Sequence, residues 1–189
     1  MKVGFIGLGT MGASIAMNAI RGQHALVVHD INRQSAHPHL REGAIWAHSP
    51  REVAANSEVV FTSLPGPSEV KEVALGEDGI LAGLSAGQAY FDLSTNSPTV
   101  MRELYTVFAE KGVSVLDAPV SGGPDGAKSG EMAIWVGGDE EVFTAHKPVL
   151  DTMSDSARYI GSIGAGSVAK LVHNLSGYII QTALAETFT

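Results

Sequence analysis

A lysine and an asparagine lie four residues apart in an apolar stretch near the end of the chain. Lys170 is flanked by apolar residues at 168–169 and 171–172, and Asn174 follows one helical turn later. Residues at i and i+4 share a helix face, and apolar neighbours lower the pKa of an ammonium group by desolvating it. A lysine in that state can exchange protons near neutral pH. The spacing predicts an acid/base lysine, and a lysine that merely snorkels from an interface helix is the structural alternative.

A serine followed by two glycines forms a second candidate site. The segment 117–123, Asp-Ala-Pro-Val-Ser-Gly-Gly, ends an apolar run that predicts a strand. Ligands of open α/β sheets bind at the carboxyl ends of strands, and exposed backbone N–H groups there can bind an anion. Ser121, Gly122 and Gly123 could therefore hold a carboxylate, although a plain turn explains the same residues equally well.

A glycine-rich hexapeptide near the amino terminus has the spacing of a nucleotide-binding loop, G-x-G-x-x-G, between a predicted strand and a predicted helix. It consists of Gly7, Leu8, Gly9, Thr10, Met11 and Gly12. The glycines allow a tight turn and close approach of a pyrophosphate, which the helix N-terminus attracts. Asp30 follows about 20 residues later, where an acid binds the ribose hydroxyls of NAD. Asn32 and Arg33 come next and could accommodate a 2′-phosphate, so the sequence predicts NAD and leaves NADP possible.

A further polar segment, 92–98, also joins a predicted strand to a predicted helix. Ser94 or Thr95 could contact the nicotinamide ribose of the cofactor, or could cap the helix. Ser97 is a favourable N-cap and Pro98 suits the first helical turn. The segment therefore predicts a helix start whose first residues lie at the ligand-binding edge of the sheet.

Short apolar runs alternate with segments of helical period along most of the chain. The predicted strands are Val3–Ile6, Ala25–His29, Val59–Ser63, Ala89–Leu93, Val113–Asp117, Met132–Val136 and Ala157–Ile160. The predicted helices are Thr10–Arg21, Gln34–Arg41, Pro67–Ala74, Pro98–Lys111 and Glu140–Asp151. This alternation predicts an α/β fold, a Rossmann-type doubly wound and mostly parallel sheet with helices on both faces.

The end of the chain has one long helical pattern with no strand after it. Apolar residues recur at helical spacing from Gly164 onwards, and the pattern continues to Thr189. We therefore expect a dinucleotide-binding domain over 1–163, and over 164–189 the start of an interdomain helix leading into an all-helical domain outside this sequence. His173 is a rival base to Lys170, but we expect it to pack against that domain. We also expect the helix to dimerise or to be poorly ordered near Thr189.

Composition argues against several classes of protein. The formal net charge is −8 and no segment clusters lysine and arginine, which disfavours nucleic-acid binding. Cysteine is absent, and the His37-Pro38-His39 segment reads as a solvated loop because no further ligand completes a metal site. No apolar run is long enough to span a bilayer, and the amino terminus has no signal segment. A cytoplasmic protein that binds neither metal nor membrane is expected.

Together these segments resemble the β-hydroxyacid dehydrogenase family, to which the 3-hydroxyisobutyrate dehydrogenases belong, over essentially the whole chain. Phe5–Gly12 resembles its cofactor motif, Asp117–Gly123 its substrate motif, and Gly164-x-Gly166-x-x-x-Lys170-x-x-x-Asn174 its catalytic motif. Glu69 departs from the pattern, because relatives often have an amide there. The site residues implied by the resemblance are a catalytic Lys170 supported by Asn174, a substrate carboxylate site at Ser121, Gly122 and Gly123, and cofactor contacts from Leu64, Pro65, Val70 and Thr95, with Thr95 also near the substrate.

The resemblance implies an oxidoreductase that transfers a hydride between NAD(P) and a small 3-hydroxy acid, with the lysine as proton acceptor or donor. It also implies a closing all-helical domain and a homodimer or homotetramer, so this chain alone is expected to be inactive. Two alternatives remain. One is a reductase of a short semialdehyde such as tartronate or succinic semialdehyde, and the other is a non-catalytic module for nucleotide binding or oligomerisation. An enzyme for phosphorylated sugar acids is disfavoured because basic residues do not cluster.

Overall fold

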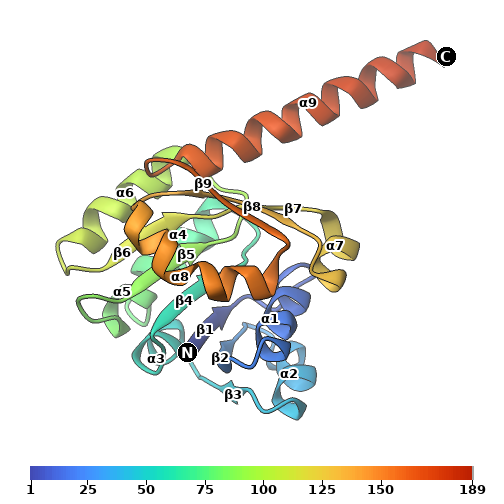
Figure 1. The fold of residues 1–189 in the computed structure, drawn as a ribbon. Helices are drawn as coiled ribbons and strands as arrows, with labels where there is room; N and C mark the ends of the chain where they lie inside the picture. Colours follow the sequence, from blue (N-terminus) through green and yellow to red (C-terminus); the bar gives the residue numbers. More distant parts are fainter. Residues whose placement is uncertain (189) are drawn as a thin grey trace.

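A mixed sheet runs through the centre of the protein in the computed structural model, which describes residues 1–188 (Figure 1). Within that range its strands are β1 (Lys2–Ile6), β2 (Ala25–His29), β3 (Ile45–Trp46), β4 (Val59–Thr62), β5 (Ala89–Asp92), β6 (Ser114–Asp117), β7 (Val120–Ser121), β8 (Ala133–Gly137) and β9 (Ser156–Gly161). Strands β3, β2, β1, β4, β5 and β6 are parallel neighbours in that order. Strand β8 runs antiparallel to β6 and β7, and β9 pairs parallel with β8. The 3-2-1-4-5-6 order is that of a doubly wound sheet, whose switch point lies between β1 and β4.

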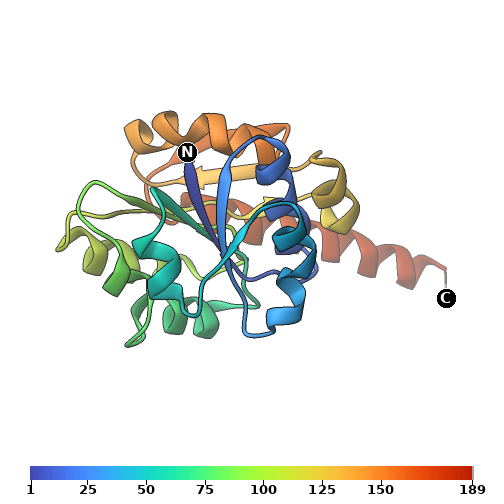
Figure 2. The same ribbon diagram turned by 90° about the horizontal axis from the view of Figure 1, so that it is seen from below.

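Helices cover both faces of this sheet, as the view from below shows (Figure 2). They are α1 (Gly12–Arg21), the 3₁₀ helix η1 (Arg33–Ala36), α2 (His37–Arg41), α3 (Pro50–Ala55), α4 (Pro67–Leu75), α5 (Ile80–Gly83), α6 (Pro98–Ala109), α7 (Gly123–Ser129), α8 (Glu140–Met153) and α9 (Ala165–Thr187). Buried side chains of α1, α7 and α8 pack on one face, and those of α3, α4, α5 and α6 pack on the other. The sheet is therefore the middle of three layers.

Alternation along the central strands produces a hydrophobic core on each face. In β5, Phe91 packs with α1 and α8, while Tyr90 packs with the helices of the opposite face. Successive side chains of a strand point to opposite faces, so a strand buried on both faces reads as a continuous apolar run. The ring of Phe61 in β4 lies 5.2 Å from that of Phe91 and 6.5 Å from that of Phe5. This packing holds the carboxyl ends of β1, β4 and β5 in fixed positions.

The predicted fold class is confirmed, with one helix wrong and several short elements missed. The segment Gln34–Arg41 is not one helix but forms η1 and then α2, because Pro38 has no N–H to donate to the carbonyl of Gln34. The sequence analysis also missed β3, β7, α3, α5 and α7, which are two to seven residues long. Segments of this length contain too few periodic positions to be recognised.

The histidines beside Pro38 lie in α2 and not in the predicted solvated loop. His37 is exposed, but His39 is 1% exposed and its Nε2 lies 2.8 Å from the carbonyl oxygen of Ala13 in α1. This contact ties α2 to the first turn of α1, so His39 has a structural role. Within residues 1–188, no three His, Asp or Glu side chains lie close enough together to hold a metal ion.

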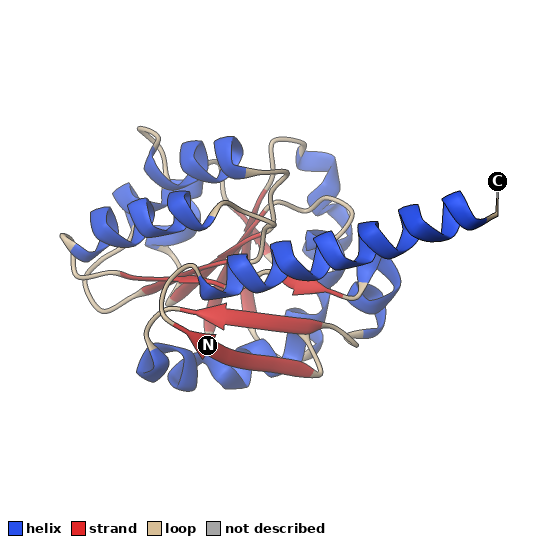
Figure 3. Ribbon diagram, turned by 90° about the horizontal axis from the view of Figure 1, so that it is seen from above, coloured by secondary structure: helices blue, strands red, loops and turns tan. Residues whose placement is uncertain are grey.

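The last helix, α9, leaves the body of the protein and extends beyond it (Figures 1 and 3). Its beginning packs on β8, β6 and α6. Further along, it exposes a series of large apolar side chains, which are Leu175, Tyr178, Ile179, Ile180 and Leu184, and Phe188 directly after the helix is exposed as well. The expectation of poor order near Thr189 concerns a residue outside the described part of the chain. In the described part, no helix combines the length and hydropathy needed to cross a bilayer.

Candidate functional site

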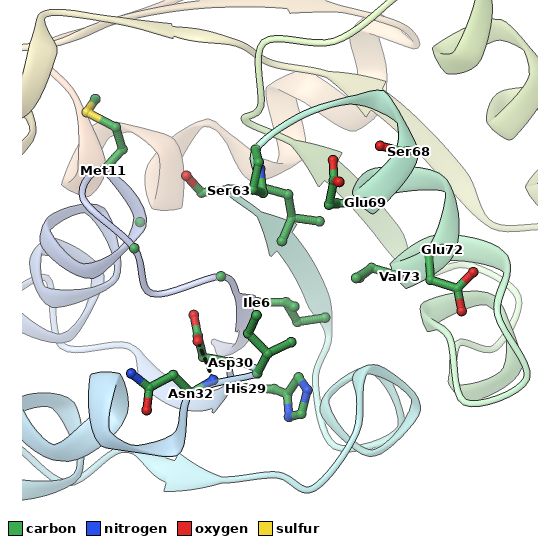
Figure 4. Close-up of a pocket in the computed structure, with 16 residues that line it drawn as sticks. Ile6, Met11, His29, Asp30, Asn32, Ser63, Ser68, Glu69, Glu72 and Val73 are labelled. Atoms are coloured by element: carbon green, nitrogen blue, oxygen red, sulfur yellow. Dashed lines mark hydrogen bonds between the residues drawn. The ribbon is translucent and has the colours of Figure 1, made fainter.

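A cleft of about 840 Å³ opens at the carboxyl ends of β1, β2 and β4, at the switch point of the sheet. It is lined by Ile6, Gly7, Gly9, Met11, Gly12, His29, Asp30, Ile31, Asn32, Ser63, Leu64, Pro65, Ser68, Glu69, Glu72 and Val73. Figure 4 shows Asp30 and Asn32 on one side of the cleft and Glu69, Glu72 and Val73 of α4 on the other. A cleft of this size at this point of a doubly wound sheet is the usual place for a dinucleotide.

The absence of a side chain has a different structural reason at each of the three glycines of the loop at the cleft. Gly7 has a φ of +93°, and a Cβ there would lie 2.3 Å from the carbonyl oxygen of Ser63. A Cβ on Gly12 would lie 1.9 Å from the carbonyl oxygen of Gly7. A Cβ on Gly9, in contrast, would meet no atom within 4 Å from the described residues other than its two chain neighbours. The fold thus requires Gly7 and Gly12, whereas the absence of a side chain at Gly9 leaves open space above the loop.

The helix that follows this loop is suited to an anion. Met11, the N-cap residue of α1, makes no side-chain capping hydrogen bond, and the first turn contains no acidic residue. The backbone N–H groups at a helix N-terminus attract phosphate when no side chain caps them. Together with the space above Gly9, this arrangement fits the pyrophosphate of NAD.

Asp30 is held in place at the end of β2 by backbone donors. Its Oδ2 accepts a hydrogen bond from Leu8 N at 2.6 Å, and its Oδ1 accepts one from Asn32 N at 2.8 Å. A fixed carboxylate binds ribose hydroxyls and repels a 2′-phosphate. The guanidinium of Arg33 lies 5.6 Å from the Trp46 ring centre, and no lysine or arginine lines the cleft among the described residues. These features favour NAD over NADP.

The remaining residues predicted to contact the cofactor lie at different depths. Leu64 and Pro65 line the cleft. Val70 is fully buried in the core between α4 and the sheet, so its side chain supports the cleft from behind and does not line it. Thr10 and Thr95 are exposed and do not line the cleft. Their contacts with a cofactor or substrate stay predictions.

A buried carboxylate that the sequence analysis did not single out joins two loops at this edge of the sheet. Asp92 accepts hydrogen bonds from Thr62 Oγ1 at 2.8 Å, from Ser94 N at 3.1 Å and from Asn96 Nδ2 at 2.8 Å. Ser94 Oγ in turn accepts from Leu64 N at 2.9 Å. Burial raises the pKa of Asp92 although these hydrogen bonds oppose the shift. The network fixes the loop after β4, which lines the cleft, to the loop after β5.

Ser94 and Ser97 thus have separate roles in the predicted segment 92–98. Ser94 belongs to the Asp92 network, whereas Ser97 Oγ accepts from Thr99 N at 3.3 Å and caps α6. The predicted N-cap is therefore confirmed, and Pro98 is the first residue of the helix. Because Ser97 caps α6, the exposed Thr95 is not needed as the N-cap of that helix.

A second buried carboxylate anchors the start of α9. Asp117, at the end of β6, is 1% exposed, and it accepts from Gly164 N at 2.7 Å and from Ser167 N at 2.5 Å. Gly164 has a φ of +91°, and a Cβ on Gly166 would lie 2.3 Å from the carbonyl oxygen of Trp135. The glycines of the predicted catalytic motif therefore let the helix start pack directly against the sheet, with Asp117 as its cap.

We expect replacement of Asp117 by Ala to lower the free energy of unfolding by about 3 kcal/mol, because two backbone N–H groups lose their buried partner. Asp117→Asn, which keeps one acceptor oxygen, should cost clearly less. Asp151→Ala is the control, because it removes only an exposed ion pair with Lys147 and should cost about 0–1 kcal/mol. Urea unfolding measures all three variants, and an Asp117→Ala loss no larger than the control would contradict the anchoring role.

Lys170 lies on α9 about one turn beyond this anchor. Its side chain is partly buried, and this desolvation lowers its pKa from the usual 10.5. Among residues 1–188, no carboxylate lies within ion-pair distance of its Nζ, so no nearby negative charge opposes the shift. Asn174, one turn later, is also partly buried. The structure thus shows the desolvated lysine that the sequence predicted.

A hydrogen bond brings the predicted substrate segment to the helix of Lys170. Ser121 Oγ, at the end of β7, lies 3.1 Å from Nε2 of His173. The imidazole ring of His173 also contacts the Trp135 ring of β8, with ring centres 5.2 Å apart. The expected packing of His173 against a domain outside this sequence stays a prediction, and within the chain its ring contacts Ser121 and Trp135. Residues 170, 173 and 174 share one side of a helix, so Ser121 lies beside the face that bears Lys170 and Asn174.

Comparison with known proteins agrees with the geometry of the cleft. Residues 2–161 match the family described as the NAD binding domain of 6-phosphogluconate dehydrogenase. The chain belongs to this family. Gly9 and Asp30 both lie within the residues that match this NAD-binding family.

This NAD-binding domain has relatives among the hydroxyacid dehydrogenases. It is 39% identical over 184 residues to a probable mitochondrial 3-hydroxyisobutyrate dehydrogenase of Dictyostelium discoideum, covering 97% of this chain and 57% of that protein. It is 37% identical over 186 residues to 2-(hydroxymethyl)glutarate dehydrogenase of Eubacterium barkeri, covering 98% and 62%. The solved structure of Mycobacterium tuberculosis 3-hydroxyisobutyrate dehydrogenase with L-serine matches with a TM-score of 0.93 at 34% identity, covering 99% and 63%. The resemblance found in the sequence is confirmed, and the chain spans 57 to 63% of the length of these relatives.

Proposed function

We propose that the protein to which this NAD-binding domain belongs is an NAD-dependent dehydrogenase of small 3-hydroxy acids, with Lys170 as the proton acceptor. The observation that carries the proposal is the convergence of a desolvated lysine and the Ser121 segment at the carboxyl edge of an NAD-binding sheet. A module that only bound nucleotide would need neither group. The proposal includes an all-helical domain beyond residue 163 that closes the site, and a homodimeric or homotetrameric assembly.

The substrate class follows from the chemistry that the relatives' names share. 3-Hydroxyisobutyrate, 2-(hydroxymethyl)glutarate and L-serine, which appear in those names, all have a primary alcohol on the carbon next to the one that bears the carboxylate. A site for such a molecule needs an anion-binding group and a base a short distance apart. Ser121 with Gly122 and Gly123 supplies the first, and Lys170 supplies the second. We therefore propose substrates of the form HOCH₂–CHR–COO⁻.

Each residue has a definite task in this proposal. Neutral Lys170 accepts the proton of the substrate hydroxyl, and Asn174 holds the same oxygen from one helical turn away. Ser121 and the backbone N–H groups of Gly122 and Gly123 orient the carboxylate. NAD supplies the hydride-accepting chemistry when bound. In the reverse direction the reduced cofactor would supply the hydride, and the Lys170 ammonium returns the proton to the carbonyl oxygen, which gives the semialdehyde reductase reaction.

The lowered pKa of Lys170 predicts that kcat/KM changes with pH in opposite senses for oxidation of the hydroxy acid and for reduction of the aldehyde. Oxidation needs the neutral amine, so kcat/KM should rise with pH and level off above a pKa that lies below 10.5. Reduction needs the ammonium, so its kcat/KM should fall over the same range. Steady-state rates of the intact protein in both directions test this. Profiles that rise or fall together would contradict the acid/base assignment.

The experiment that tests the proposed function is nicotinamide absorbance of the intact protein with NAD or NADP and a panel of hydroxy acids. The panel contains 3-hydroxyisobutyrate, L-serine and 2-(hydroxymethyl)glutarate, with 2-hydroxy acids as negative controls. Reduction of NAD by one or more 3-hydroxy acids alone would support the proposal. The non-catalytic module would be favoured instead if the protein bound NAD but neither oxidised any hydroxy acid of the panel nor reduced the matching semialdehydes.

A further inference from the structure

His173 occupies a position that the proposed reaction does not explain. It follows Lys170 by three residues on α9, and its ring contacts Ser121 at the end of β7 and Trp135 of β8. Its Nε2 lies 3.1 Å from Ser121 Oγ, the hydroxyl that the proposed function assigns to the substrate carboxylate. The role that this contact gives to His173 rests on the proposed function.

The imidazole of His173 contacts two groups that belong to the sheet. Trp135 of β8 lies against it with an interplanar angle of 58°. Strands β7 and β8 are paired, with Ser121 opposite Ala133, and Trp135 N donates to the carbonyl of Pro119. Both contacts of the ring thus belong to one short antiparallel pair, while the ring itself belongs to α9. Two contacts to neighbouring strands restrict the orientation of this exposed histidine.

The direction of the hydrogen bond decides what Ser121 can bind. A hydroxyl has one donor and two acceptor positions, and an ionised carboxylate accepts only. If Ser121 donated to Nε2, its oxygen lone pairs would face the substrate carboxylate and repel it. If Nε2–H donates to Oγ, the hydroxyl proton is free for the carboxylate. Only the second arrangement allows both hydrogen bonds to exist together.

We propose that His173 is a positioning residue that donates from Nε2–H to Ser121 Oγ and so directs the Ser121 hydroxyl proton to the substrate carboxylate. His173 then acts on substrate binding and takes no proton from the reacting hydroxyl. This assigns the neighbouring residues on α9 to different ends of the substrate. Lys170 serves the alcohol, and His173 serves the carboxylate through Ser121.

Two amide substitutions form the matched test in the intact protein. The Nδ2 of Asn lies nearer the backbone, in the place of the imidazole Nδ1, whereas the Nε2 of Gln can take the place of the donor that reaches Ser121. We expect His173→Asn to raise KM for the hydroxy acid by roughly tenfold, because the Ser121 hydroxyl would no longer be directed to the charged carboxylate. His173→Gln should stay within about threefold of the original KM. Neither variant should change kcat or the Kd of NAD appreciably.

A double substitution separates this role from general disturbance of α9. If His173 acts through Ser121, His173→Asn should have no further effect on KM in a Ser121→Ala background. Additive effects, equal effects of Asn and Gln, or a loss confined to kcat would each overturn the proposal. A loss of kcat would make His173 an acid/base group instead.

The protonation of the ring can be read without any turnover. Nitrogen-15 NMR of the histidine rings in this chain, with the His173 signal assigned by its loss in His173→Gln, should show a protonated Nε2. An unprotonated Nε2 would overturn the proposed direction of the hydrogen bond. If the intact protein oxidises no hydroxy acid, the proposed function fails, and the ring spectrum still decides the direction of this bond.

Discussion

Replacement of Lys170 by Ala is expected to reduce kcat of the intact protein by roughly 10²- to 10⁴-fold, the usual contribution of a general base. The ammonium is desolvated, and no carboxylate among residues 1–188 pairs with it, so its removal should not unfold the helix start that Asp117 anchors. The Kd of NAD should stay unchanged, because Lys170 does not line the nucleotide cleft. Steady-state kinetics and calorimetric titration of NAD measure the two quantities.

Lys170→Arg separates proton transfer from charge. Arginine keeps the positive charge but does not lose its proton in proteins, so oxidation by this variant should be as slow as by Lys170→Ala. Lys147→Ala is the control for loss of a lysine, because Lys147 forms only an exposed ion pair with Asp151. Substantial oxidation by Lys170→Arg would mean that the lysine acts through its charge. Survival of turnover in Lys170→Ala would remove Lys170 from the chemistry altogether.

Replacement of Gly9 by Ala should weaken NAD binding by this chain by roughly 10- to 100-fold while leaving its stability intact. Apart from its chain neighbours, the added methyl group meets no atom of residues 1–188 within 4 Å, so the folded state accepts it. It would, however, enter the space above the loop that we assign to the pyrophosphate, and a clash of that kind costs about 1–3 kcal/mol. Calorimetric titration measures the Kd, and urea unfolding measures the stability.

Gly12→Ala is the matched comparison for this experiment. A Cβ there would lie 1.9 Å from the carbonyl oxygen of Gly7, so this variant should lose stability as well as NAD binding. If Gly9→Ala bound NAD as tightly as the original chain, the pyrophosphate would not lie over Gly9. If it unfolded as readily as Gly12→Ala, the open space at Gly9 would not exist in solution.

The cofactor half of the site was largely predictable because it is local in sequence. Residues Lys2–Arg21 contain a strand, the glycine loop and a helix in direct succession. This motif can be recognised from the order of neighbouring residues alone. Asp30 could be found because a doubly wound sheet places the next strand end beside that loop. Val70 shows the limit of this approach, since its spacing on α4 does not reveal that its side chain points into the core.

The substrate half required contacts between residues far apart in the chain. Asp117 looked like one polar residue in a turn segment, but it holds the first turn of α9 through Gly164 and Ser167. Asp92 similarly joins the loops after β4 and β5. One feature of the sequence could have indicated this role, since both carboxylates end an apolar run that predicts a buried strand. A buried charge must find hydrogen-bond partners. The identity of those partners could not be read from the sequence.

The sequence by itself determined the three-layer α/β fold, the nucleotide loop and the desolvated surroundings of Lys170, because each depends on the period of apolar residues or on neighbours within a few positions. Only the tertiary structure decided that Ser121 meets His173, that Asp117 caps α9 and that Gly9 faces open space. The first two features depend on how β6, β7 and β8 bring distant segments to one edge of the sheet, and the third depends on how the loop between β1 and α1 packs. Hydrogen bonds are satisfied by whichever partner the packing brings within reach, and the linear order of residues does not specify that partner.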